Sequence, residues 1–132
     1  MSEYLFRGRR LEDKRWVYGY LCTSINYIGD ANPKLSIQEG GYFRQVDPAT
    51  VGQFINRTDN KQQKLFNGDK VLFNYGRHYN EPKGLTRFGT IVYDKRDCAF
   101  AVSIDNSAVL VKFWDIARIE IIGTIHDGEV TP

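Results

Sequence analysis

The sequence contains few of the cysteine and histidine residues that catalysis or metal binding would use, and they are widely separated along the chain. Two cysteines and two histidines are present: Cys22, Cys98, His78 and His126. Nucleophilic catalysis needs a Ser or Cys beside a His base and an orienting acid, and a metal site needs three or four ligands. Both cysteines lie in apolar, strand-like runs typical of buried free thiols. We therefore expect no enzyme activity, no catalytic residue, no metal and no cofactor.

The carboxylates favour turns over acid–base catalysis. Asp94 and Asp97 flank a basic turn, and Asp69 follows Gly68 where its side chain can accept backbone N–H groups. The pair Gly40-Gly41 lacks the Lys and Ser/Thr of a nucleotide-binding loop.

A basic and aromatic cluster near the start of the chain is the one candidate site for nucleic acid. Its members are Arg7, Arg9, Arg10, Lys14, Arg15 and Trp16. Such a mixture can hold a single strand by phosphate contact and base stacking. Against this, Glu12 and Asp13 dilute the cluster, its aromatic residues can fill a core, and the net charge is only +2. Nucleic-acid binding is therefore the alternative hypothesis.

Length and composition indicate a small β protein. The chain has 132 residues, of which 42% are apolar and 14% aromatic, and aromatic residues favour pleated, half-buried surfaces. No run is long enough to cross a membrane. The N-terminal sequence MSEYLFRGRR lacks the apolar stretch of a signal peptide, so we expect a cytoplasmic protein.

Short apolar runs separated by turn residues predict a mainly β fold. The N-terminal half, residues 1–60, is expected to contain strands at 4–8, 16–23, 34–37, 42–46 and 53–56. Asp47 and Pro48 are expected to begin one helical turn, as N-cap and first helical residue. The C-terminal half, residues 61–132, is expected to contain strands at 70–75, 88–93, 98–104, 108–113 and 119–125. That order matches a small SH3-like barrel, which we expect to pack on the first half as one compact domain.

Glycine spacing raises the question of an internal duplication. Gly19 and Gly52 are 33 residues apart, and Gly89 and Gly123 are 34 apart. Residues 18–21 parallel 88–91, residues 51–54 parallel 122–125, and residues 6–9 parallel 66–69. Two interpretations stay open, a repeated unit and coincidence among twelve glycines. A different strand order in the two halves would exclude the first.

Four stretches in this order resemble the YopX family of phage and prophage proteins. They are residues 6–9 with 16–21, then 46–54, 64–71 and 120–126, so the resemblance spans nearly the whole chain. The chain departs from the family at Asn67, where an acidic residue is usual, and near Asn60, where an Asn-Gly hairpin is missing. The resemblance implies a mainly β protein encoded by mobile elements in bacteria. It implies no settled activity and supplies no catalytic residues.

The function predicted from the sequence is contact with other proteins. An all-β chain has strand edges to cover, and loop tyrosines suit an interface; the candidates are Tyr27, Tyr42, Tyr75 and Tyr79. We expect a phage accessory protein that forms a homo-oligomer in the bacterial host cytoplasm. Gly52→Val and Gly123→Val are expected to reduce solubility more than any Arg change.

Overall fold

The computed structural model describes residues 5–24, 34–75 and 85–127. The chain divides into two compact units, Met1–Phe54 (unit 1) and Ile55–Pro132 (unit 2). The described residues are mainly β, which confirms the predicted fold class. The boundary falls six residues earlier than the sequence suggested, because strand β5 (Gly52–Thr58) runs through it. That the two halves pack as one compact domain stays a prediction.

Unit 1 is an antiparallel meander whose last strand returns to the first. Its elements are β1 (Phe6–Arg9), β2 (Trp16–Ser24), β3 (Lys34–Glu39), β4 (Tyr42–Gln45), the 3-10 helix η1 (Pro48–Thr50) and the beginning of β5. The spatial order is β4-β3-β2-β1-β5. Phe6 lies opposite Gly19 on β2 and opposite Gln53 on β5, so β1 lies between these two strands.

Alternation along β2 separates a core face from an outer face. Val17 is fully buried and packs with Ile37 and Val46 to form the centre of the unit 1 core. Tyr18 and Tyr20 lie on the other face and are 44% and 65% exposed. The period of two along a strand produces this division.

The helical turn predicted at Asp47 is present. The Asp47 carboxylate accepts the N–H of Ala49, and Pro48 is the first residue of η1. The buried Thr50 hydroxyl accepts the N–H of Arg9 at 2.8 Å, which ties η1 to the first strand. A further antiparallel bridge between Arg10 and Val46 joins the two ends of the meander.

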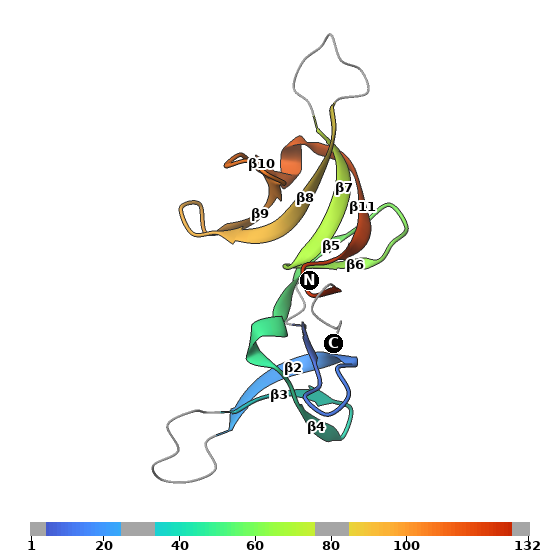
Figure 1. Ribbon diagram of the computed structural model, residues 1–132, viewed down its shortest axis with the longest axis vertical. Helices are drawn as coiled ribbons and strands as arrows, with labels where there is room; N and C mark the ends of the chain where they lie inside the picture. The colour runs from blue at the N-terminus through green and yellow to red at the C-terminus, as the bar shows by residue number, and fades with distance from the viewer. Residues whose placement is uncertain (1–4, 25–33, 76–84, 128–132) are drawn as a thin grey trace. The chain divides into compact units, whose positions relative to one another are not determined.

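Unit 2 contains a second meander with its own returning strand. Its elements after β5 are β6 (Lys64–Phe66), β7 (Asp69–Tyr75), β8 (Leu85–Asp94), β9 (Ala99–Ile104), β10 (Leu110–Lys112), the 3-10 helix η2 (Phe113–Asp115) and β11 (Ile116–Thr124). The spatial order is β10-β9-β8-β7-β11, and Figure 1 shows β7 between β8 and β11. Strand β6, which the sequence analysis missed, is a neighbour of β5 in the other sheet.

The predicted order of elements in unit 2 is confirmed, with shifted boundaries. Strand β8 begins three residues earlier than expected, at Leu85, and β11 begins three earlier, at Ile116. Closure of this sheet into an SH3-like barrel stays a prediction. Among the described residues, no helix is long and apolar enough to cross a membrane.

Buried carboxylates hold the turns of unit 2, in agreement with the sequence analysis. Asp69 is fully buried, and its carboxylate accepts the N–H of Phe66 at 2.8 Å. Asp59 is 6% exposed and accepts the N–H groups of Lys61, Gln63 and Ile121. Each bond pairs a backbone N–H and stabilises the turn.

The two units share one order of elements. In each, four strands form a meander, a three-residue 3-10 helix follows the fourth, and the fifth returns to pair with the first. The prediction of repeated halves required one strand order, and the two units have it. Gly19 and Gly89 occupy equivalent places, since they lie opposite Phe6 on β1 and Val71 on β7.

The other two sequence parallels do not match in the structure. Gly52 lies two residues after η1 and opposite Arg7, whereas Gly123 lies near the end of β11 and opposite Lys70. Residues 66–69 span the end of β6, the turn and the first residue of β7, so they are not the counterpart of β1. The similar spacings of Gly19 to Gly52 and of Gly89 to Gly123 are therefore coincidental, although the two units share one strand order.

Candidate functional site

Two arginines of the basic cluster predicted to bind nucleic acid are buried against Trp16. Arg7 and Arg9 are 6% and 8% exposed, and their guanidinium carbons lie 4.6 and 4.9 Å from the ring centroid of Trp16. Cation–π stacking of this kind contributes on the order of 0.5–2 kcal/mol. The structure does bring these three residues together, but the Trp16 ring is occupied by protein cations.

The rest of the cluster lies in the β1–β2 turn. Arg10 forms ion pairs with Glu12 at 2.9 Å and with Asp13 at 3.1 Å. Lys14 and Arg15 are exposed. Among the six predicted residues, only these two place their charge on the surface, so the predicted phosphate-binding footprint is small.

The exposure of one cysteine differs from the prediction, and one histidine is buried. Cys98 is exposed and lies in the β8–β9 turn with φ 51°, so the prediction that both thiols are buried is wrong for this one. The turn reaches one residue further than expected and takes Cys98 out of strand β9. Cys22 is partly buried. His126 is 7% exposed. His78 lies outside the described residues.

Tyr93 and Cys98 form a polar contact at the same turn. A hydrogen bond between the two side chains raises the pKa of the Tyr93 hydroxyl, with burial as the second cause. The Cys98 thiol also approaches the Lys95 carbonyl oxygen at 3.7 Å. Within the described part of the chain, no group of three or more His, Cys, Asp and Glu side chains could hold a metal ion.

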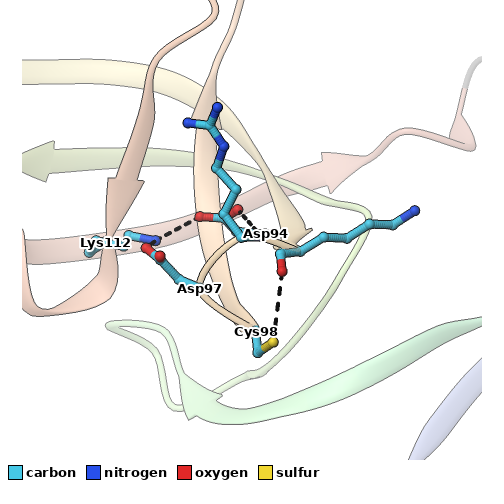
Figure 2. Close-up of polar contacts among 6 residues, drawn as sticks. Asp94, Asp97, Cys98 and Lys112 are labelled. Atoms are coloured by element: carbon cyan, nitrogen blue, oxygen red, sulfur yellow. Dashed lines mark hydrogen bonds and ion pairs between the residues drawn. The ribbon is translucent and has the colours of Figure 1, made fainter.

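A lysine held by two carboxylates connects this turn to η2. The Lys112 amine lies 2.7 Å from Asp94 and also contacts Asp97, and Figure 2 shows it between the two carboxylates. The hydrogen bond from Lys112 lowers the pKa of Asp94 below its ordinary value, against the opposing effect of desolvation. The bonds to Asp94 and Asp97 raise the pKa of Lys112. We call these three residues the Lys112 triad.

The Lys112 triad borders a cavity of about 350 Å³ in unit 2. The residues that line this cavity, called here the η2 cavity, are Ile55, Arg57, Asp97, Ala99, Phe100, Lys112, Phe113 and Trp114. Ile55 and Phe113 are each 8% exposed and supply a buried apolar floor. Trp114 is 73% exposed. An apolar cavity of this size with a few polar groups is the usual form of a binding site.

The two cations that line the η2 cavity differ in their partners. The charge of Lys112 is compensated by the two carboxylates of its triad. The guanidinium carbon of Arg57 lies 5.0 Å from the Phe113 ring centroid and forms no ion pair with any described residue. The cavity can therefore contact an apolar group and an anion at the same time.

Sequence reasoning missed this site. The sequence suggests a compact, non-strand stretch at residues 114–118, but β11 begins at Ile116, so only Trp114 and Asp115 fit that expectation. Nothing in the sequence places Arg57 at the same cavity as Trp114. The available signal was an aromatic pair, Phe113-Trp114, at the end of a strand where only one of the two can point into the core.

A second cavity lies in unit 1 and has a less apolar lining. Its volume is about 390 Å³, and it is lined by Arg10, Leu11, Glu12, Phe43, Arg44 and Gln45. Its apolar residues Leu11 and Phe43 are 54% and 66% exposed, so it has no buried apolar floor. The η2 cavity is the better candidate for binding.

Comparisons of the chain with protein-family models, with curated proteins and with solved structures found no match.

Proposed function

We propose that this protein is a non-enzymatic accessory protein that acts by binding another protein through the η2 cavity. The observation that carries the proposal is Trp114, which is 73% exposed and lines the same cavity as the buried Ile55 and Phe113 and as Arg57, an arginine with no ion pair among the described residues. Trp and Arg are the residue types most enriched at the energetic centres of protein interfaces. The resemblance to the YopX family supports a phage or prophage origin and action in the cytoplasm of a bacterial host.

The order of elements in unit 2 supports a small SH3-like barrel as the scaffold of this site. Asp97 of the β8–β9 turn and Trp114 of η2 line one cavity on this scaffold. The scaffold provides rigidity, and the side chains provide recognition.

Self-association is a second part of the proposal, and unit 1 supplies its surface. Tyr20, Tyr42 and Phe43 are 65%, 65% and 66% exposed, and β4 is the edge strand of its sheet. An isologous dimer requires one self-complementary surface of this kind. Light scattering over a hundredfold dilution range should show a dimer that Phe43→Ser weakens, and a monomer at every concentration would contradict this part.

The binding proposal is tested by placing a photo-crosslinking amino acid at position 114 in the full chain, expressed in bacterial cells. Position 88 is the matched control, because Phe88 is a 55% exposed aromatic residue of unit 2 outside the cavity. We expect a discrete protein adduct from position 114 that is absent from position 88. Equal adducts from both positions, or none from 114, would refute a binding site at the cavity.

Nucleic-acid binding by the basic cluster remains the alternative. Gel shifts with single-stranded DNA and RNA at two salt concentrations distinguish the two proposals, because phosphate contacts weaken steeply with salt. We expect no salt-dependent shift. A shift that Lys14→Ala or Arg15→Ala weakens would favour the alternative, since these two residues are exposed.

A further inference from the structure

We infer that the η2 cavity recognises a peptide segment in which an apolar or aromatic side chain lies next to a carboxylate. This inference rests on the proposed function and specifies the chemistry of the partner. Three features of the cavity lead to it: the uncompensated Arg57, the charge of the Lys112 triad, and the exposed ring of Trp114.

Arg57 is the group that would bind the carboxylate. Its guanidinium lies over the Phe113 ring, 5.0 Å from the centroid, and has no acidic partner among the described residues. A guanidinium presents a planar fork of N–H donors that matches a carboxylate in two parallel hydrogen bonds. Stacking on an aromatic ring restricts the side chain before the ligand arrives, so less entropy is lost on binding.

Lys112 does not supply a second anion site. Its single positive charge faces the negative charges of Asp94 and Asp97, so the triad carries a net charge of −1. Asp97 is 57% exposed and lines the cavity, where its oxygens can accept a backbone N–H or a basic side chain. The cavity therefore offers one cation, Arg57, and one hydrogen-bond acceptor, Asp97.

The same cavity also offers room for an apolar group. Phe100, Phe113 and Trp114 line the cavity, and its volume of about 350 Å³ exceeds that of a single side chain. Burial of a large apolar side chain contributes roughly 1.5–3 kcal/mol. The polar ends select the neighbours of that side chain.

A nucleic-acid strand fits the same features poorly. Each nucleotide brings a phosphate, whereas the cavity offers one uncompensated cation beside a triad of net charge −1. Successive phosphates would approach the carboxylates of Asp94 and Asp97. A lone carboxylate on an apolar segment avoids that repulsion.

The experiment is a positional-scanning array of terminally blocked hexapeptides, probed with the full chain. Three proteins are compared: wild type, Arg57→Gln, and Arg118→Gln as a matched control, because Arg118 is an exposed arginine of unit 2 that does not line the cavity. We expect wild type and Arg118→Gln to select Asp or Glu within two positions of an aromatic or large apolar residue. Arg57→Gln should lose the acidic preference, with affinity for the best peptide falling roughly tenfold or more.

The location of binding is read from the indole N–H signals in an NMR titration of the best peptide. The chain has two tryptophans, Trp16 and Trp114, so Trp114→Phe assigns the two signals. We expect the Trp114 signal to move and the Trp16 signal to stay. Movement of Trp16 alone would overturn the inference.

The outcomes separate this inference from the proposed function. If position 114 crosslinks to a protein but the array shows no acidic preference, the inference is wrong and the proposed function stands. If position 114 gives no adduct, the proposed function is refuted, and the inference that rests on it is refuted with it. If oligo(dT) moves the Trp114 signal and Arg57→Gln abolishes the movement, a nucleic-acid ligand replaces the peptide.

Discussion

The 3-10 helices of the two units occupy the same place in the same order of strands, yet they have different surroundings. In unit 1 the N-cap of η1 is Asp47, whose carboxylate accepts the N–H of Ala49. In unit 2 the N-cap of η2 is Lys112, which makes no side-chain cap hydrogen bond. Its amine contacts Asp94 and Asp97 of the β8–β9 turn instead.

This difference shows how one order of strands can present an exposed aromatic ring beside a cavity in one unit only. The middle residue is Ala49 in η1 and Trp114 in η2. A capped turn with a small residue satisfies its own backbone and presents little surface. A turn that is held by a neighbouring hairpin can display a large aromatic ring beside a cavity.

The largest effects are expected at the equivalent glycines. A Cβ at Gly19 would lie 1.9 Å from the Gln38 carbonyl oxygen, and one at Gly89 would lie 2.7 Å from the Ser103 carbonyl oxygen. Gly19→Ala and Gly89→Ala should each lower the free energy of unfolding by about 1–3 kcal/mol or more, with Gly19→Ala the more severe. Urea denaturation measures this.

Gly41→Ala is the matched control, because no atom lies within 4 Å of its added Cβ. If Gly19→Ala and Gly89→Ala unfold at the same urea concentration as Gly41→Ala, the close approach of the third strand is not a shared feature. Gly123→Val should also destabilise the fold, because φ at Gly123 is +158° and its Cβ would lie 2.6 Å from the Asp127 carboxylate, which accepts the N–H of Thr124.

The cap comparison predicts a smaller loss of stability. Asp47→Ala removes an N-cap hydrogen bond and should lower the free energy of unfolding by about 0.5–2 kcal/mol. Asp47→Asn is the control, because its side-chain oxygen can still accept the N–H of Ala49. Thermal melting of the three proteins should rank wild type and Asp47→Asn together, and equal melting of Asp47→Ala would show that the cap is dispensable.

The Lys112 triad predicts a pH dependence that belongs to unit 2. The pKa of Asp94 is lower in the folded state, so its contribution to stability is full above the unfolded pKa of about 3.9 and is lost as pH falls through the folded value. The pKa of Lys112 is raised, so its contribution is lost only as pH rises above about 10.4. Lys112→Gln should flatten the acid limb of melting temperature against pH, and an unchanged limb would rule the triad out as its cause.

The smallest effects on stability are expected at the ligand-facing residues of the η2 cavity. Trp114 is largely exposed and Arg57 has no ion pair with a described residue, so Trp114→Ala and Arg57→Gln should change the free energy of unfolding by only about 0.5 kcal/mol. Both should nevertheless weaken peptide binding. A large loss of stability in either variant would assign that residue to the fold.

Much of the fold follows from local patterns. Alternation along β2 predicts which side chains of Trp16, Val17 and Tyr18 face the core, and Asp47-Pro48 predicts η1. Boundaries were less accurate, because the β8–β9 turn extends through Cys98 in a left-handed conformation that no pattern announces. The basic cluster shows the limit of composition, since Arg7 and Arg9 count as surface charge in the sequence and stack on Trp16 in the structure.

The sequence by itself determined the fold class, the succession of strands and most of the turn residues, because backbone preferences and apolar alternation act over a few neighbours. Only the tertiary structure decided that Arg57 lies at Phe113 and Trp114, and that Lys112 holds Asp94 and Asp97. The pairing of β8, β9 and β10 brings Lys112 to Asp94 and Asp97. Arg57 lies on β5, in the other sheet, and meets Phe113 through side-chain packing. What these charged and aromatic side chains can bind depends on which residues they contact, and a local sequence pattern does not contain that information.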